Sequence, residues 1–210
     1  MIDSKFYNNV KIGKNVVIEP FCIIGIPPKG VKDGEYETII GDNSIIRSHS
    51  DIYSGNKIGK NFQTGHHVII RENNIIGDDC ALGSFSEIAF DVKMGDNVKI
   101  HSNCFIFEGT MIEDDVKLNP GVFVLNTKFP FRPGHKPEIE PVIIRKGARI
   151  TARVTLMPGV VIGKYALIGA GSLVTKDVPE YAVAYGHPAT IKGDIRDIKD
   201  KDGNTQYKVE

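Results

Sequence analysis

The sequence predicts an all-β protein: a parallel β-helix of about eight triangular coils, with a long protruding loop and a C-terminal cap. Three observations predict this fold. Aliphatic residues recur every six positions, small or β-branched residues recur four positions after them, and the composition favours strands and turns over helices. A six-residue period fits neither the 3.6-residue period of an amphipathic helix nor the two-residue alternation of a flat sheet. It fits a solenoid in which each hexad supplies one short strand and one corner.

The aliphatic repeat is clearest in the middle of the chain. Between Ile40 and Val124, fourteen of the fifteen positions spaced six apart hold an aliphatic residue or Met, and Thr64 is the exception. The series resumes from Ile144 to Val174, and three isoleucines before residue 25 extend it toward the N-terminus. We expect these side chains to fill the interior, with three hexads per coil and neighbouring coils about 4.8 Å apart.

The small position of the repeat contains all three cysteines, Cys22, Cys80 and Cys104. A small side chain is expected where the chain turns inward at a corner. We therefore expect buried, unreactive thiols rather than disulfides, redox groups or metal ligands. The 22 glycines and the absence of tryptophan agree with a fold built of short strands and many turns.

The charge balance excludes several classes of protein. There are 26 basic and 26 acidic side chains among 210 residues, whereas nucleic-acid-binding and membrane-surface proteins usually present a net basic field. No apolar segment approaches the ~20 residues that span a bilayer, and the N-terminus does not resemble a signal peptide. We expect a cytoplasmic protein that neither binds nucleic acid nor inserts into a membrane.

Two segments interrupt the repeat, and a third follows it. The first, at 25–38, is rich in Gly, Pro and charge, and it is equally well explained as a tolerated decoration or as a substrate contact. The second, at 127–141, contains four prolines, and the register there slips by two residues beyond one coil. An excursion of this length in a compact solenoid is usually functional. We expect residues 1–178 to form the β-helix and 179–210 to form a cap and a charged tail, with either a short helix or a hairpin turned at Asp202–Gly203.

The C-terminal coils, with IGAGSLVTKDVP at 168–179 and GHPA at 186–189, resemble the hexapeptide-repeat acyltransferase family. The resemblance extends over roughly residues 10–192. It implies a left-handed β-helix, although the general rule for parallel crossovers would give a right-handed one. It also implies a homotrimer with sites between subunits and acetyl-CoA as the co-substrate.

The resemblance places the acetyl-CoA site at this C-terminal end. The pantetheine arm of CoA is thin and carries two amides, so it needs small side walls and free backbone groups. Small residues lie on successive coils here, and two lysines are placed to meet the phosphates of CoA. The candidate cofactor-binding residues are Thr151, Ala152, Gly169, Ala170, Lys176 and Lys192.

The acceptor site is expected on the middle coils, where residues 18 apart lie one above another. One column contains Ser54, Glu72, Phe90, Glu108 and Asn126, a second contains His49, His67, Phe85 and Asn103, and a third contains Ser48, His66, Ser84 and Ser102. His101 is expected at a neighbouring corner. The candidate substrate-binding residues are His66, Glu72, Ser84, His101 and Arg132.

Two further segments narrow the resemblance. TGHHVIIRENNIIG at 64–77 and LNPGVFVLNTKFPFR at 118–132 resemble segments of amino-sugar acetyltransferases from nucleotide-sugar pathways. In those proteins a nucleotide-linked amino sugar lies between two subunits, with its amine facing the thioester. The resemblance therefore implies acetyl transfer to the amine of a UDP- or dTDP-linked amino sugar for surface-polysaccharide synthesis.

One departure from the family favours an amine acceptor over a hydroxyl. Hydroxyl-acetylating members have a histidine before a proline in the second loop, whereas here Phe129 precedes Pro130. An alcohol needs proton removal during attack, but an amine attacks as the free base and loses its proton later. Asn126 could orient the amine, and the candidate proton acceptors are Glu108, His67, His66 and His135.

Three alternatives remain at this point. The first is a sugar O-acetyltransferase. The second is a zinc enzyme resembling the γ-class carbonic anhydrases, with His66 and His101 as ligands; Phe105, Ile106 and Phe107 occupy the region of the third histidine, so we expect no metal. The third is a non-catalytic scaffold, which would have featureless coils.

Overall fold

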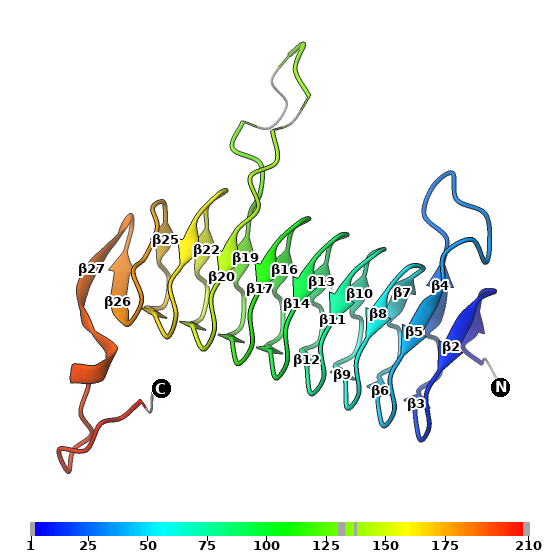
Figure 1. Ribbon diagram of the computed structural model, residues 1–210, viewed down its shortest axis with the longest axis horizontal. Helices are drawn as coiled ribbons and strands as arrows, with labels where there is room; N and C mark the ends of the chain where they lie inside the picture. Colours follow the sequence, from blue (N-terminus) through cyan, green and yellow to red (C-terminus); the bar gives the residue numbers. More distant parts are fainter. Residues whose placement is uncertain (1–2, 130–132, 137, 208–210) are drawn as a thin grey trace.

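The computed structural model describes residues 3–129, 133–136 and 138–207, and within them the protein is an elongated all-β solenoid (Figure 1). Short strands stack along the long axis, and the two ends of the chain lie at opposite ends of the rod. The one helical segment in these ranges is a single 3-10 turn, η1 (Ile195–Asp197). Within the same ranges, no helix has the length and hydrophobicity needed to span a bilayer.

The strands form three sheets, which are the faces of a triangular prism and are called here faces A, B and C. Face A contains β1 (Lys5–Phe6), β4 (Ile23–Ile26), β7 (Asp51–Tyr53), β10 (Ile69–Ile70), β13 (Glu87–Ile88), β16 (Phe105–Ile106), β19 (Phe123–Val124), β22 (Thr155–Leu156) and β25 (Leu173–Val174). Face B contains β2 (Val10–Ile12), β5 (Thr38–Ile40), β8 (Lys57–Ile58), β11 (Ile75–Ile76), β14 (Lys93–Met94), β17 (Met111–Ile112), β20 (Ile143–Ile144) and β23 (Val161–Ile162). Face C contains β3 (Val17–Ile18), β6 (Ile45–Ile46), β9 (Gln63–Thr64), β12 (Ala81–Leu82), β15 (Lys99–Ile100), β18 (Lys117–Leu118), β21 (Arg149–Ile150), β24 (Leu167–Ile168), β26 (Ala182–Gly186) and β27 (Ala189–Asp194).

The register confirms the predicted coil. Ile70 pairs with Ile88 in parallel, so a residue lies beside the residue three hexads further along the chain. The β-helix is left-handed, as the family resemblance implies. Face A has nine strands, so the rod is about one coil longer than the sequence predicts. The sequence analysis missed the first coil because only isolated isoleucines mark the repeat there.

The aliphatic position of each hexad forms the core. In each two-residue strand the second side chain points inward, and Ile70, Ile88 and Ile106 are at most 1% exposed. The three cysteines are buried and free, as expected. Burial raises the pKa of the Cys80 thiol to about 11, which keeps it protonated and unreactive at neutral pH.

Three edges join the faces, and each is named after the faces it connects. The described residues of the AB edge are 7–9, 27–37, 54–56, 71–74, 89–92, 107–110, 125–129, 133–136, 138–142 and 157–160. The BC edge contains residues 13–16, 41–44, 59–62, 77–80, 95–98, 113–116, 145–148 and 163–166. The CA edge contains residues 19–22, 47–50, 65–68, 83–86, 101–104, 119–122, 151–154 and 169–172.

The corners share one backbone conformation. At most corners the third residue after the inward aliphatic has a positive φ, such as 54° at Asn97 and 73° at Gly109. Most of the non-glycine residues at this position are Asn or Asp, which tolerate the left-handed region better than other side chains. This requirement explains why Asn, Asp and Gly recur in the sequence just before the small inward residue.

Both insertions leave the rod from the AB edge, and Figure 1 shows them projecting on the same side. The first lies between β4 and β5, and the second lies between β19 and β20. At the base of the second, Thr127 and Ile139 form an antiparallel bridge. The Glu140 N–H donates to the carbonyl of Asn126 at 2.7 Å. The loop therefore begins as a two-stranded stem on the AB edge.

The C-terminal segment covers the last coil. β26 continues face C in parallel with β24, and β27 turns back antiparallel to β26. The tail then contains both structures that its sequence allows. The 3-10 turn η1 comes first, followed by a tight turn through Asp202–Gly203 in which Lys199 bridges Thr205.

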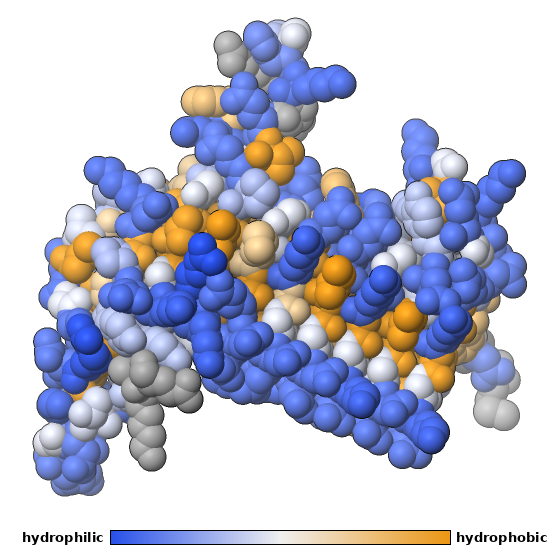
Figure 2. Space-filling model, in the orientation of Figure 1, coloured by the Kyte–Doolittle hydropathy of each residue, from blue (hydrophilic) through white to orange (hydrophobic). Residues whose placement is uncertain are grey.

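Figure 2 shows face B and the BC edge below it. Outward side chains on face B alternate between lysines and aliphatics, for example Lys57, Ile75 and Lys93. The BC edge forms a continuous hydrophilic band, built from Asp, Asn and Lys at its corners. Along this band the Asp78 and Asp96 carboxylates accept backbone N–H groups of the preceding coil at 2.7 and 2.8 Å.

Candidate functional site

The predicted site residues lie on two different edges of the prism. Glu72, Glu108 and Asn126 are on the AB edge, together with the insertions. His66, His67 and His101 and the small residues of the C-terminal coils are on the CA edge, whereas His135 is in the second insertion. The width of face A separates the two groups within one chain.

On the AB edge, Glu72 and Glu108 differ in their surroundings. The Glu72 carboxylate accepts two hydrogen bonds from the Arg71 guanidinium, at 2.9 and 3.0 Å, and only 13% of its side chain is exposed. The Glu108 carboxylate is half-buried and makes no hydrogen bond or ion pair with any residue in the described ranges. Glu108 is therefore free to meet a ligand, whereas Glu72 is already paired.

Asn126 lies at the base of the second insertion and is 3% exposed. Its Nδ2 donates to the backbone carbonyl of Glu108 at 3.2 Å, and its Oδ1 accepts from the Thr127 hydroxyl at 3.1 Å. The amide thus links the column of Glu108 to the stem of the loop. It fixes where Glu108 and the loop lie relative to each other.

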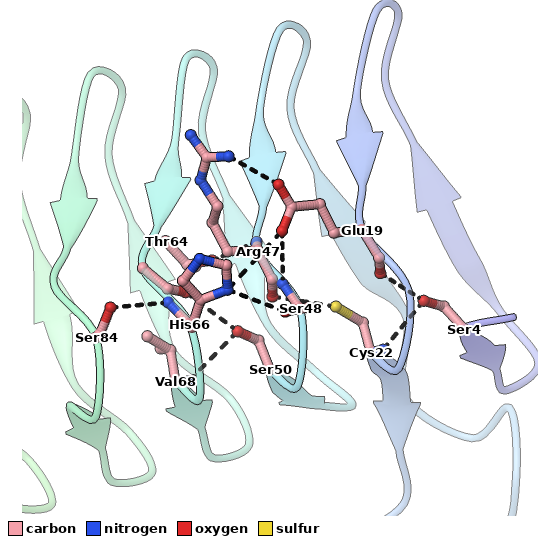
Figure 3. Close-up of polar contacts among 11 residues, drawn as sticks. Ser4, Glu19, Cys22, Arg47, Ser48, Ser50, Thr64, His66, Val68 and Ser84 are labelled. Carbon is pink, nitrogen blue, oxygen red and sulfur yellow. Dashed lines mark hydrogen bonds and ion pairs between the residues drawn. The ribbon is translucent and has the colours of Figure 1, made fainter. Parts of the chain in front are cut away.

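The N-terminal half of the CA edge contains a connected polar cluster (Figure 3). Glu19 accepts hydrogen bonds from the Ser48 N–H at 3.0 Å and from the Arg47 guanidinium at 2.7 Å, and these bonds lower the pKa of Glu19. The Ser48 hydroxyl lies 2.9 Å from His66 Nδ1, and the backbone N–H of His66 donates to the Ser84 hydroxyl at 2.9 Å. His66 and Ser84, two predicted substrate-binding residues, are therefore direct neighbours.

His67 belongs to a ladder of stacked rings at the outermost position of the same edge. Its ring lies 4.7 Å from that of His49 and 5.0 Å from that of Phe85, and His49 in turn stacks on Phe21 at 4.8 Å. His67 has a φ of 55°, because it occupies the left-handed corner position. Both faces of its imidazole are covered by rings, so only its edge is open to a partner.

His101 lies on the same CA edge as His66, and not at a neighbouring corner as the sequence suggested. It directly follows β15 and precedes Ser102, whose N–H donates to His101 Nδ1 at 2.9 Å. His66 and His101 are two coils apart. Within the described residues, no group of three or more His, Cys, Asp or Glu side chains is arranged to hold a metal ion.

The C-terminal half of the CA edge has the small walls that the sequence predicts. Thr151 and Ala152 are half-buried and Ala170 is exposed one coil further on. Gly169 is needed for packing, because a Cβ there would lie 2.6 Å from the Cβ of Tyr185. Lys192 lies next to this ring, with its Nζ 5.7 Å from the Tyr185 ring centroid.

Three predictions fall elsewhere. Lys176 is exposed and follows β25, so it lies toward the AB edge and away from Ala152 and Ala170. Arg132 lies outside the described residues. Phe129, which stands where hydroxyl-acetylating relatives have histidine, is 57% exposed.

Face A, between the two edges, presents both apolar and polar side chains, with Asp51 and Glu87 among the polar ones. Its outward side chains include Ile69, which is 36% exposed, and the stacked rings of Phe105 and Phe123, whose centroids are 5.0 Å apart. Burial raises the pKa of Asp51 on this face. Exposed aromatic residues in a contiguous arrangement are typical of a surface that contacts another protein chain.

Comparison with known families agrees with this geometry. Residues 141–176 match the family "Bacterial transferase hexapeptide (six repeats)", and residues 73–108 and 91–126 match "Hexapeptide repeat of succinyl-transferase". The matched segments have the same 18-residue register that the sheets show. The two models together match residues 73–126 and 141–176, and the chain is similar to hexapeptide-repeat transferases over these segments.

Two curated relatives match this chain over short segments. A dTDP-3-amino-3,6-dideoxy-alpha-D-galactopyranose 3-N-acetyltransferase from Aneurinibacillus thermoaerophilus is 57% identical over 51 residues, which is 24% of this chain and 27% of the relative. A galactoside O-acetyltransferase from Lactococcus lactis is 50% identical over 56 residues, which is 27% of each chain. The chain thus covers about a quarter of the length of these relatives.

A solved structure has the same fold over almost the whole length of this chain. The UDP-N-acetylglucosamine acyltransferase from Campylobacter jejuni superposes with a TM-score of 0.76 at 18% identity, covering 96% of this chain and 79% of that one. At this identity the likeness shows the fold alone.

The sequence analysis did not identify a set of cations on face C. Lys99 and Lys117 are outward residues of successive strands, β15 and β18, and line a groove beside His101. The signal was present as two lysines 18 positions apart. It was overlooked because lysines at outward positions are usually only solvated.

Proposed function

We propose that this protein is an acetyl-CoA-dependent N-acetyltransferase that acts on the amine of a UDP- or dTDP-linked amino sugar. It would work as a homotrimer in the cytoplasm and supply a surface-polysaccharide pathway. The observation that supports this most is the division of the candidate site between two edges of one prism, because such a site is complete only when two subunits meet.

The stacked, solvent-facing rings of Phe105 and Phe123 on face A support the homotrimer. If the A faces of three copies surround a common axis, the AB edge of each copy lies against the CA edge of the next. A closed arrangement of this kind buries Phe105 and Phe123 and leaves no unmatched surface. It also brings Glu108 and the second loop of one subunit toward the histidines of its neighbour.

The CA edge supports acetyl-CoA as the donor. Thr151, Ala152, Gly169 and Ala170 are small residues on successive coils, and they would leave a narrow track for the thin pantetheine arm. Lys192 lies at the end of this track, where it could meet phosphate charge. Both curated relatives named above are acetyltransferases.

The proposed reaction needs little acid–base assistance. The amine nitrogen attacks the thioester carbonyl, the tetrahedral intermediate collapses, the C–S bond breaks, and the thiolate leaves and is protonated to CoA-SH. The proton that the nitrogen loses passes to Glu108, whose carboxylate is unpaired, while His67, His66 and His135 are the alternatives. Asn126 holds Glu108 at the base of the loop. His66, Ser84 and His101 would bind the acceptor.

The amine acceptor is supported by Phe129 and by the N-acetyltransferase relative. The galactoside O-acetyltransferase relative supports the alternative, transfer to a hydroxyl. Phe129 opposes this alternative because it cannot remove a proton from an alcohol.

Thiol release separates the two acceptors. The purified protein is mixed with acetyl-CoA and either UDP- or dTDP-linked amino sugars or the corresponding sugars with a hydroxyl in place of the amine. We expect release only with the amines. Release only with the hydroxyl sugars would assign O-acetylation, and no release with either would reject the proposed activity. Analytical ultracentrifugation should give about three times the 23.1 kDa of one chain.

A further inference from the structure

Face C contains a shallow groove of about 420 Å³ that none of the site residues discussed so far explains. It runs along β9, β12, β15 and β18 and reaches the CA edge at His101. Gly83 forms part of its wall, and a Cβ there would lie 2.3 Å from the Ser102 nitrogen, so the coil stacking itself requires a glycine. The groove is therefore a fixed part of the rod.

The groove lies on the most concentrated column of positive charge in the sheets. Lys99 pairs with Lys117, and Lys117 pairs with Arg149, so three cations occupy consecutive strands. Among the outward strand positions that the structure describes, no other column has three cations in succession. Face B avoids this repulsion, because an isoleucine separates Lys57 from Lys93. Like charges directly opposite each other destabilise a sheet, so the column on face C calls for an anion.

The surrounding charges leave the column uncompensated. Within the described ranges, no carboxylate lies within ion-pair distance of Lys99 or Lys117. Two acids of the BC edge beside this column, Asp79 and Asp115, accept hydrogen bonds from Asn61 at 2.9 Å and from Asn97 at 2.8 Å. Lys146 also lies 3.9 Å from Asp115. The Lys99 ammonium donates to the backbone carbonyl of Asp79, which does not neutralise its charge.

The remaining polar groups of the groove can all donate hydrogen bonds. His101 Nδ1 accepts from the Ser102 N–H, so the proton of a neutral imidazole is on Nε2, which is free to donate. Gln63 and Asn119 offer amide N–H groups, and Ser102 offers a hydroxyl. Among the residues that the structure describes, no carboxylate lines the groove. Two ammonium groups with several neutral donors and a small-residue wall form a surface that suits phosphate oxygens.

We propose that this groove binds the diphosphate of the nucleoside diphosphate that the acceptor sugar carries. The inference rests on the proposed function for its choice of ligand. CoA also carries a diphosphate, but its expected track along Ala152 and Ala170 lies on later coils than the groove, beyond β18. The acceptor's sugar would then extend from the groove past His101 toward the CA edge, where it meets the donor from the other direction.

The test is a calorimetric titration of the full-length protein with dTDP, UDP and CoA. The variants are Lys99→Gln, Lys117→Gln and the double substitution. Lys93→Gln is the matched control, because Lys93 is an exposed outward lysine in the same coil as Lys99 but on face B. Circular dichroism and thermal unfolding confirm that each variant is folded.

We expect each single substitution to raise the Kd of dTDP or UDP by roughly tenfold, and the double substitution by more. The Kd of CoA should change by less than twofold in every variant, and Lys93→Gln should change neither ligand. The wild-type affinity for dTDP should fall as salt rises, and fall less steeply in the double variant.

Three results would overturn the inference. The double variant could bind dTDP and UDP as tightly as the wild type does, or the wild-type protein could bind CoA but neither nucleotide. The third is that the substitutions weaken the binding of CoA instead of the binding of the nucleotides. The proposed function can fail separately from this inference. If the protein binds dTDP through Lys99 and Lys117 but neither binds CoA nor releases thiol, the diphosphate groove stands and the proposed transferase activity is rejected.

Discussion

The AB and CA edges are built from the same six-residue repeat, yet they differ in nearly every side chain that leaves the rod. The AB edge accommodates two long insertions and presents Glu108 beside the stem of the second one. The CA edge has no insertion, and it changes along its length from a polar cluster around Glu19 to small side walls at Ala152 and Ala170.

The difference shows which parts of the repeat are constrained by folding. The inward aliphatic and the small residue at the turn are fixed by core packing on every edge, and the left-handed corner restricts one further position. The two residues between them face outward, and some of them still support the stacking, as the Asp78 and Asp96 carboxylates do. Glu108 and Ala152 occupy these outward positions, and the edge on which each lies decides which ligand it can reach.

The largest expected effect comes from filling the small end of the CA edge. Ala152→Trp should raise the Kd of CoA by at least about 100-fold, because an indole would occupy the track of the pantetheine arm. The control is Lys164→Trp, which places the same side chain at the equivalent corner position of the BC edge. Equal CoA affinity in the two variants, measured by calorimetry, would remove the CA edge from the cofactor site.

The next effect concerns Glu108 on the AB edge. Glu108→Gln should lower kcat by roughly 10- to 100-fold and leave the Kd of CoA unchanged, because it removes the proton acceptor but not the donor track. Steady-state kinetics with an amino-sugar nucleotide measures the change.

Mixing the two variants tests whether the edges cooperate between subunits. In trimers assembled at random from Glu108→Gln and Ala152→Trp chains, about a quarter of the sites combine an intact AB edge with an intact CA edge. Activity should therefore recover to about a quarter of the wild-type value. No recovery in such trimers would mean that each chain contains a complete site.

A smaller effect is expected at His67, whose corner position has a φ of 55°. His67→Val should destabilise the protein by roughly 1–2 kcal/mol, since a β-branched residue tolerates this conformation poorly. His67→Asn should unfold at nearly the same denaturant concentration as the wild type, because Asn suits the corner. If kcat falls tenfold in His67→Asn, proton acceptance belongs to His67 rather than to Glu108.

The smallest effect is on the BC edge, which has no proposed ligand. Partial burial tends to raise the pKa of Glu113, but hydrogen bonds from Arg145 at 2.6 Å and from the Lys146 N–H at 2.9 Å outweigh it and lower the pKa. A carboxylate with a lowered folded-state pKa stabilises the protein fully above its ordinary pKa of 4.5. This contribution is lost as the pH falls through the lowered value.

Glu113→Gln should therefore reduce stability at pH 7 by roughly 0.5–1 kcal/mol, as expected for a largely exposed pair. It should also flatten the loss of stability on acidification below about pH 4.5. Urea unfolding at pH 7 and at pH 3 measures both. Identical pH profiles for the variant and the wild type would show that the pair contributes nothing.

The fold was predictable because core packing repeats along almost the whole rod, with Thr64 the one inward position between Ile40 and Val124 that is neither aliphatic nor Met. Ile70, Ile88 and Ile106 reveal both the strand position and the coil length, and the buried Cys104 confirms the turn position. The first coil was harder to count, because its inward Ile12 is 40% exposed at the open end and only isolated residues mark the period there.

The site was less predictable because outward residues are not constrained by the repeat. The columns of Glu108 and His67 followed from the spacing, but their pairing with other side chains did not. The bidentate contact of Arg71 with Glu72 depends on side-chain conformation, and the ring stack of His67 depends on a corner backbone that the aliphatic period does not encode. His101 was assigned to a neighbouring corner although it directly precedes Ser102, whose column the spacing had already placed on the edge of His66.

The parallel stacking of coils also has an evolutionary consequence. Because each complete turn of the chain advances the rod by one interstrand distance of about 4.8 Å, the separation between the small-walled end and the cationic groove can change only in whole steps. Inserting or deleting 18 residues between β18 and β21 would keep every interior contact in phase while moving one ligand away from or toward the other. Relatives that accept longer or shorter substrates could thus arise by altering the number of turns, with no new packing to invent.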